Sequence, residues 1–469
     1  MEKLDKIYMK KGGKTAFVCL YALLLFAFLT LFAAKKLEYI DSFYQAAVTG
    51  FFFSLLGTAA FTYFSFVRKA PFCTVIFAGI SAGAALLMRF ALFDYISDDF
   101  GLAISSWIEQ ISRAPGLSGW AMNIGDYNPP YLYVLTVIAK LPVVPLYATK
   151  FFSICADFAI AYYIMRLCAT AKKSLNTQVL IFTLALFVPT FLLNSSYWAQ
   201  CDGIYAAAAL AFVYYGVTGR SKTAVALSAV AFAFKLQSIF VLPLLAVFLF
   251  TKKIKFSHIF IFPAVFAALL MPVILAGRGV GDTLSIYLNQ ASAYATLSIF
   301  LPNIYQFFYS YQVADDGIHF RVAELIEYKW FSTVGIMLAG TGVVILLYFL
   351  WIYRKKITAQ TVFTAGFILA LGIPYLLPCM HERYFFLAEV FALAVFVFDS
   401  KRWFVPFFVT LGSFCAYSTY LFKDAAVLPY FRLLALINLL LILTEIRHLY
   451  QLSAVPSAEV KGAFYGPDK

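Results

Sequence analysis

The run TAFVCLYALLLFAFLTLFAA, from Thr15 to Ala34, determines the class of this protein. It carries no charge and reaches the roughly 20 residues that a helix needs to cross the hydrocarbon core of a bilayer. It is too long for the apolar region of a secretory signal and has no small-residue cleavage site, so we expect a retained first span. Comparable apolar windows recur along all 469 residues, which predicts a helical protein that crosses the membrane many times.

The composition supports the same class. Hydrophobic residues make up 63% of the chain and charged residues only 13%, whereas soluble domains are about 25% charged. A β-barrel is disfavoured because the apolar runs are continuous, not alternating. The net charge of +13 is explained by cytoplasmic loops that face anionic lipid. We therefore expect a lipid bilayer as partner and no nucleic acid.

Hydropathy predicts an all-α polytopic bundle of about fourteen spans. The expected bounds are 15–34, 47–67, 72–92, 147–168, 177–195, 203–218, 222–236, 237–250, 257–276, 332–353, 361–378, 384–398, 403–421 and 428–446. We expect one integral-membrane domain over residues 1–469. Its parts are extra N-terminal spans in 1–70, a central region in 72–400, C-terminal spans in 401–450 and a cytoplasmic tail in 451–469.

The distribution of basic residues predicts the orientation. If the Lys-rich head is cytoplasmic, every second loop should be basic, and one pair, Lys35-Lys36, is the exception. The loops that agree contain Arg68-Lys69, Lys172-Lys173, Arg220 with Lys222, Lys252-Lys253 with Lys255, Arg354-Lys355-Lys356, Lys401-Arg402 and Arg447. This bias predicts that both termini are cytoplasmic.

Two long connections, 93–146 and 277–331, then lie on the outer face. Loops of this length are usually functional. The apolar run 131–141 is short and is followed by Pro142, so we expect a helix in the membrane interface and not a span. Three polar clusters face the same side, at 94–99, 197–202 and 381–384, and polar groups at membrane boundaries mark functional sites by default.

The first cluster supplies carboxylates. Asp98 and Asp99 follow a span directly, and a carboxylate held at the membrane surface can remove a proton from a hydroxyl. A neighbouring like charge tends to raise one pKa of such a pair, which suits a base. The alternative interpretation is a solvated loop end or a helix cap.

The other clusters supply cations and amides. Lys235, Arg278, His381 and Arg383 lie near outer span ends and suit a phosphate. Gln237 follows Lys235 in an apolar stretch, and Glu382 could orient His381 or Arg383. The alternatives are a Lys that extends to the interface and a charge cluster that anchors a helix start. The four His are dispersed, which disfavours a zinc site.

The middle cluster suits a sugar. Trp198 can face apolar ring hydrogens, while Gln200 and Asp202 can bind hydroxyls. The alternative for Trp198 is a role in the aromatic belt of the membrane interface.

Together these residues resemble the C-type (GT-C) glycosyltransferases that use lipid-phosphate sugars, specifically bacterial relatives of GPI mannosyltransferase II. The resemblance covers roughly residues 85–400, in order, and makes 72–400 a GT-C-like catalytic region. The matching stretches are SDDF at 97–100 with Trp107, GDYNPPYLY at 125–133, NSSYWAQCD at 194–202, FKLQ at 234–237, YLNQ at 287–290, PNIYQ at 302–306 and HERY at 381–384.

The resemblance implies roles for particular residues. An Asp in the first outer loop is the family's catalytic base, which corresponds to Asp99. The family has a small residue before it where this chain has Asp98, so both carboxylates stay candidates. Asp126, Asn128 and Asn303 lie in matched stretches and join the substrate-binding candidates.

The expected function is transfer of a hexose, with mannose or glucose favoured, from a polyprenyl-phosphate donor to a hydroxyl of a membrane-bound or cell-surface lipid or glycan. The reaction would invert the anomeric centre on the outer face of a bacterial plasma membrane. No cofactor is expected, with a divalent cation left open. The alternatives are a lipid flippase or transporter, which shares the cations, and an outer-face glycan polymerase or ligase.

Overall fold

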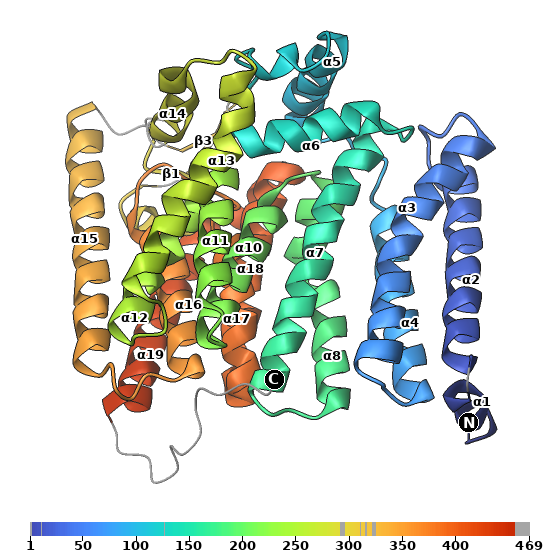
Figure 1. The fold of residues 1–469 in the computed structure, drawn as a ribbon. Helices are drawn as coiled ribbons and strands as arrows, with labels where there is room; N and C mark the ends of the chain where they lie inside the picture. Colours follow the sequence, from blue (N-terminus) through green and yellow to red (C-terminus); the bar gives the residue numbers. More distant parts are fainter. Residues whose placement is uncertain are drawn as a thin grey trace. The chain divides into compact units, whose positions relative to one another are not determined.

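Helices dominate the fold of this chain (Figure 1). The computed structural model describes residues 2–10, 12–125, 127–290, 296–309, 311–314, 317–320 and 325–454. The chain divides into two compact units: unit 1 comprises Met1–Gly125 and Tyr131–Ile204, and unit 2 comprises Asp126–Pro130 and Tyr205–Lys469. The division falls near the N-terminal ends of α6 (Pro129–Lys140) and α10 (Asp202–Val217).

Unit 1 is built mainly from α-helices. Its helices are α1 (Glu2–Met9), α2 (Gly13–Lys36), α3 (Phe43–Thr62), α4 (Phe72–Phe90), α5 (Ser105–Arg113), α7 (Pro145–Thr170), α8 (Leu175–Leu186) and α9 (Pro189–Leu192). The π-helical turns are η1 (Tyr63–Val67), η2 (Asp99–Ile104) and η4 (Leu193–Tyr197), and η3 (Ser118–Trp120) is a 3₁₀ turn. Helix α3 packs along α2 and α4, and α8 packs along α7 and α4 (Figure 1).

Side-chain caps start two of these helices. The Ser42 side chain accepts a hydrogen bond from the backbone N–H of Gln45 at the start of α3. The Ser174 side chain does the same for Thr177 at the start of α8. Such caps satisfy backbone donors that a helix leaves without partners at its first turn.

Unit 2 holds the remaining helices. They are α11 (Ser221–Phe234), α12 (Leu244–Phe250), α13 (Ile261–Leu275), α14 (Val280–Asn289), α15 (Leu325–Ile352), α16 (Ala359–Leu376), α17 (Phe386–Phe398), α18 (Phe404–Leu421) and α19 (Phe431–Ala454). The 3₁₀ turns are η5 (Leu236–Val241), η6 (Phe256–Phe260), η7 (Ile304–Phe307), η8 (Ser400–Arg402) and η9 (Ala425–Tyr430). Helix α16 is the core of this unit, because it packs against α15, α17 and α19.

Among its described residues, unit 2 contains four short strands. Strand β1 (Ser298–Ile299) pairs in parallel with β4 (Met380–His381), with Ser298 opposite Met380 and Ile299 opposite His381. Strands β2 (Tyr311–Ala314) and β3 (Gly317–Phe320) form an antiparallel hairpin. The β1–β4 pair therefore attaches the predicted outer connection 277–331 to the segment that carries His381.

The structure confirms an all-α polytopic membrane protein. Within the described ranges, nine helices are long and apolar enough to cross a membrane, or ten if the bent pair Leu175–Leu186 and Pro189–Tyr197 counts as one span. Four more apolar helices, including α10, α11 and α17, have only 10–17 residues. Each of the fourteen predicted segments is mainly helical, and so is 131–140, where α6 runs across the direction of α7 (Figure 1).

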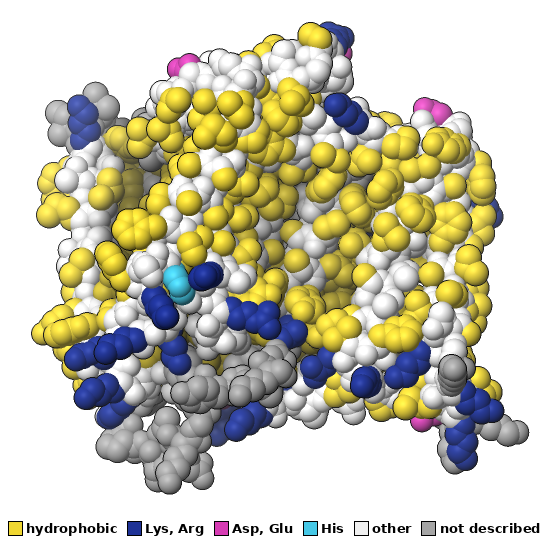
Figure 2. All heavy atoms as spheres, viewed as in Figure 1, with side chains coloured by type: hydrophobic (Ala, Val, Ile, Leu, Met, Phe, Trp, Pro, Cys, Tyr) yellow, Lys and Arg dark blue, Asp and Glu magenta, His cyan; other side chains and the backbone are white. Residues whose placement is uncertain are grey.

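The basic turns of each unit lie at the helix ends opposite its polar clusters. In unit 1, Arg68-Lys69 precedes the start of α4, and the carboxylates at 94–99 follow its end. In unit 2, Arg354-Lys355-Lys356 lies between the end of α15 and the start of α16, whereas the segment around His381 follows the end of α16. Figure 2 shows Lys and Arg side chains gathered near the lower ends of α12 and α15, with hydrophobic side chains covering the helix flanks above them.

Candidate functional site

The first candidate site is a carboxylate cluster in unit 1, formed by Asp99, Trp198 and Gln200. The Oδ2 atom of Asp99 accepts a hydrogen bond from Trp198 Nε1 at 2.8 Å and another from Gln200 Nε2 at 2.5 Å. The Trp198 and Gln200 side chains are buried, and Asp99 is half-buried. Two predicted clusters far apart in sequence therefore meet, and the carboxylate is held in one orientation.

The turn that carries Trp198 and Gln200 is fixed by its own backbone. Between them, Ala199 has a φ of 63°, in the left-handed region that residues other than glycine seldom adopt. Ser97 Oγ donates a hydrogen bond to the Trp198 carbonyl at 2.7 Å, and the rings of Tyr95 and Tyr197 stack with centroids 3.7 Å apart. Such strain persists only where the surroundings enforce it, and it is common at functional sites.

A buried ion pair that we did not predict lies beneath this turn. Arg89 Nη2 is 2.9 Å from Asp157 Oδ2, and Ser195 Oγ donates to the same oxygen at 2.7 Å. Arg89 also donates to the Leu186 carbonyl at 3.0 Å. The network joins α4, α7 and η4, so it fixes the segment that leads to Trp198. The sequence signal for this pair was a charged residue inside each of two predicted spans, Arg89 in 72–92 and Asp157 in 147–168.

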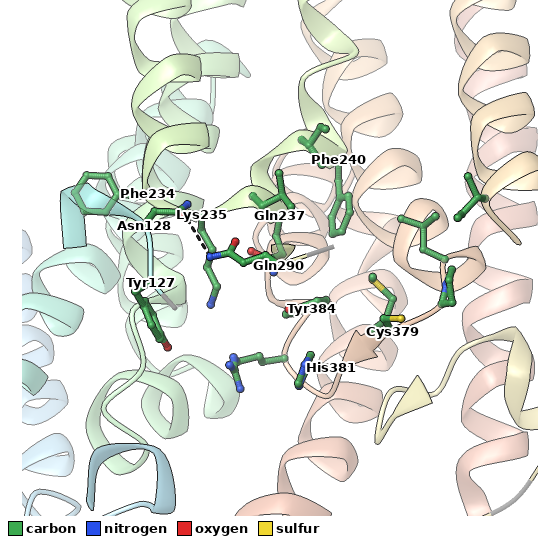
Figure 3. Close-up of a pocket in the computed structure, with 17 residues that line it drawn as sticks. Tyr127, Asn128, Phe234, Lys235, Gln237, Phe240, Gln290, Cys379, His381 and Tyr384 are labelled. Atoms are coloured by element: carbon green, nitrogen blue, oxygen red, sulfur yellow. Dashed lines mark hydrogen bonds between the residues drawn. The ribbon is translucent and has the colours of Figure 1, made fainter. Parts of the chain in front are cut away.

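The second candidate site is a cationic pocket of about 340 Å³ in unit 2 (Figure 3). Lys235, His381 and Arg383 line it, together with the amides of Asn128, Gln237 and Gln290. None of the described lining residues is an Asp or a Glu. The rest of the wall is mainly apolar and includes Ile239, Phe240, Ile336 and Leu377. A pocket with these walls suits an anion attached to a hydrocarbon.

Different elements hold the polar side chains of this pocket. Lys235 follows α11 in extended backbone and is only 8% exposed; its Nζ lies 6.0 Å from the ring centre of Tyr127 and 5.8 Å from that of Tyr205. Gln290, at the end of α14, donates from Nε2 to Asn128 Oδ1 at 3.0 Å, the dashed line in Figure 3. These contacts place an ammonium group and two amides at one side of the pocket.

The β1–β4 pair holds the opposite side. It fixes His381 at the pocket wall, and the Cys379 backbone N–H donates to the Thr296 carbonyl at 3.0 Å. Cys379 has a φ of 59°, a second left-handed residue beside a candidate site. The chain turns sharply there, from the end of α16 into β4.

Glu382 organises the two cationic residues beside it. Its Oε1 accepts from Arg383 Nη1 at 2.8 Å, and its Oε2 lies 3.7 Å from His381 Nδ1. Burial by itself raises the pKa of the Glu382 carboxyl, but the nearby His381 side chain and the charge of Arg383 outweigh burial, so that its pKa is lower than the ordinary value. Glu382 is therefore ionised at neutral pH and keeps Arg383 and His381 in place.

The structure also describes Asp98, Asp202, Arg278 and Asn303. Asp98 is exposed, and Asp202 accepts a hydrogen bond from Asn194 Nδ2 at 3.0 Å. Arg278 and Asn303 are buried but do not line the pocket. Burial lowers the pKa of Arg278, and two of its buried nitrogens, Nε and Nη1, have no hydrogen-bond partner among the described residues. Asp126 lies outside the described residues.

Within the part of the chain that the structure describes, no group of three or more His, Cys, Asp or Glu side chains is placed to hold a metal ion. Comparison of the sequence with models of known protein families and with curated proteins finds no match. A held carboxylate suits proton removal, and a cationic pocket suits an anionic leaving group.

Proposed function

We propose that this protein is a glycosyltransferase that moves a hexose, with mannose or glucose favoured, from a polyprenyl-phosphate donor to a hydroxyl of a membrane-bound acceptor. It would be a GT-C-like bundle of about fourteen spans, which adds the four shorter apolar helices and the bent pair to the nine long helices. The active face would be the outer one, opposite the basic turns, as the positive-inside bias suggests.

The composition of the cationic pocket carries this proposal. A polyprenyl-phosphate sugar has a phosphate beside a hydrocarbon, and the pocket has Lys235, His381 and Arg383 beside an apolar wall. Charge-assisted hydrogen bonds to phosphate are stronger than neutral ones, and an Arg can bind a phosphate through two of them. A nucleotide sugar would need a partner for its base, whereas a lipid phosphate needs only the cations and the apolar wall.

The mechanism would be a single displacement with inversion. Asp99 would accept the proton of the acceptor hydroxyl while the hydroxyl oxygen attacks the anomeric carbon. The bond from that carbon to the phosphate oxygen would break, and its electron pair would leave with the polyprenyl phosphate. Lys235, Arg383 and His381 would stabilise this growing negative charge, a preorganised electrostatic role.

The position of the polar groups favours a transferase over a flippase. A transporter binds its substrate near the bilayer midplane and exposes it to each side in turn. Here the carboxylate cluster follows the ends of α4 and η4, and the cationic pocket lies where α11 and α16 end. A glycan polymerase or ligase would share this arrangement and would differ in the donor, a lipid diphosphate.

Purified protein in liposomes, supplied with radiolabelled polyprenyl-phosphate mannose or glucose and a lipid extract, should transfer the label to an acceptor. Arg383→Lys keeps the charge and should retain part of the rate, whereas Arg383→Gln should retain far less. Movement of the intact labelled lipid across the vesicle without transfer would establish the flippase instead. Transfer only from a lipid-diphosphate glycan would establish the polymerase or ligase.

A further inference from the structure

An apolar groove of about 450 Å³ lies between α15, α16 and α19 in unit 2. Its described lining contains no charged residue and consists of aliphatic side chains, two aromatic residues and two glycines. All three helices are long and apolar enough to cross a membrane. The groove therefore lies at the depth of the hydrocarbon and suits a hydrocarbon ligand.

Glycines keep this groove open. A Cβ built at Gly342 of α15 or at Gly372 of α16 would meet no atom within 4 Å, so neither glycine is needed for close packing. Gly335, two turns before Gly342, behaves differently, because a Cβ there would collide with the Tyr305 hydroxyl and the Leu376 carbonyl. Helix α15 therefore touches the end of α16 at Gly335 and leaves an open space beside Gly342.

The outer end of the groove adjoins the cationic pocket. On α15, Ile336 lines the pocket and Ala339, one turn further, lines the groove; at the end of α16, Leu377 lines the pocket and Leu376 lines the groove.

The inner end is marked by the rings of Phe349 and Tyr450, whose centroids are 6.3 Å apart. From Ile336 to Phe349 the helical rise gives a length of about 20 Å. The groove thus starts beside the phosphate-binding cations and covers most of a hydrocarbon core about 30 Å thick.

We propose that this groove binds the polyprenyl tail of the donor while the cationic pocket binds its phosphate. The assignment rests on the proposed function, because it concerns the same lipid donor. The cations match one anionic head, and the groove next to them matches one tail. A diacyl phospholipid would place only one of its two chains there, so the geometry favours a single-chain lipid phosphate.

The test measures equilibrium binding of a labelled long-chain polyprenyl phosphate, without a sugar, to the full-length protein in lipid nanodiscs. Gly342→Leu and Gly372→Leu fill the groove and should weaken this binding about tenfold, equivalent to about 1.4 kcal/mol. An analogue with one isoprene unit does not reach the groove and should bind these variants as it binds wild type. Gly340→Leu is the matched control on α15. A Cβ at Gly340 would also meet no atom within 4 Å, but Gly340 does not line the groove, so this variant should bind both lipids as wild type does.

Each outcome is decisive. Unchanged binding of the long-chain lipid in both groove variants would overturn the assignment. It would also be overturned if the variants lost only a co-purified phospholipid, because the groove would then be a site for ordinary membrane lipid. If the Leu variants fail to fold, Gly342→Ala and Gly372→Ala replace them in the test. These smaller substitutions should cause a smaller loss of long-chain binding. Tail binding that depends on the groove, in a protein that transfers no hexose, would preserve the groove and reject the proposed transferase.

Discussion

At the residue scale, one carboxylate is distinguished from its neighbour by its surroundings. Asp98 and Asp99 are adjacent, yet Asp99 accepts hydrogen bonds from buried Trp198 and Gln200, whereas Asp98 is exposed. A general base must be held within reach of the proton that it removes. The geometry of the cluster therefore favours Asp99 over Asp98 as the base of the proposed reaction.

Replacing Asp99 should remove the chemistry and keep the fold. Asp99→Asn should lower the rate of hexose transfer at least about a hundredfold, the usual scale for a general base, and Asp98→Asn should lower it less than about tenfold. Initial rates in liposomes, normalised to protein that elutes as a single species, measure both. The reverse order of effects would move the base to Asp98, and wild-type rates in both variants would reject a base in this cluster.

The Glu382 carboxylate should contribute stability that depends on pH. Its pKa in the folded protein is below the ordinary value of 4.5, so the stabilisation is fully present above that value and disappears as the pH falls through the lowered pKa. The difference in thermal unfolding midpoint between wild type and Glu382→Gln should thus be largest near neutral pH and shrink in acid. A difference that stays constant down to strongly acidic pH would show that the ion pair is not its source.

At the element scale, the turn from η4 into α10 matters more than the helices on either side. The positive φ of Ala199 lets the flanking Trp198 and Gln200 side chains both reach Asp99. The Arg89–Asp157–Ser195 network holds η4 in place. The geometry of the Asp99 cluster therefore depends on a short irregular segment that regular helices hold in place.

Substitutions at Ala199 should separate backbone shape from side-chain chemistry. Ala199→Gly accepts the positive φ without strain and should keep transfer near the wild-type rate. Ala199→Val is β-branched and unsuited to that φ, so it should displace Trp198 and Gln200. A shift of about 1 Å costs about a hundredfold in rate. Equal rates in the two variants would show that the shape of this turn does not control catalysis.

At the scale of the whole molecule, each unit places polar and basic groups at opposite helix ends. In unit 1 the basic turn Lys172-Lys173 precedes α8, and the Trp198 turn follows η4. In unit 2 Arg354-Lys355-Lys356 precedes α16, and His381 follows it. A functional face opposite the basic turns is the outer face if the positive-inside bias holds.

Cysteine labelling in intact cells tests this orientation one unit at a time. Ser118→Cys in unit 1 and Gly281→Cys in unit 2 occupy exposed positions in the predicted outer connections and should react with an impermeant thiol reagent. Lys172→Cys and Lys355→Cys, also exposed, should react only after the cells are opened. The exposed native Cys19 and Cys73 are first changed to Ser. Labelling in the opposite pattern would place the candidate sites on the cytoplasmic side.

The membrane class, the helical segments and the candidate polar clusters follow from the sequence alone, because hydropathy and charge are local properties of a chain in a bilayer. Contacts between distant residues follow only from tertiary packing. Trp198 lies 99 positions from Asp99, and β1 pairs with β4 across the length of α15 and α16. Local composition likewise cannot tell that Asp202 accepts a hydrogen bond from Asn194. Helix packing decides which polar side chains meet, since the same local pattern is compatible with many arrangements.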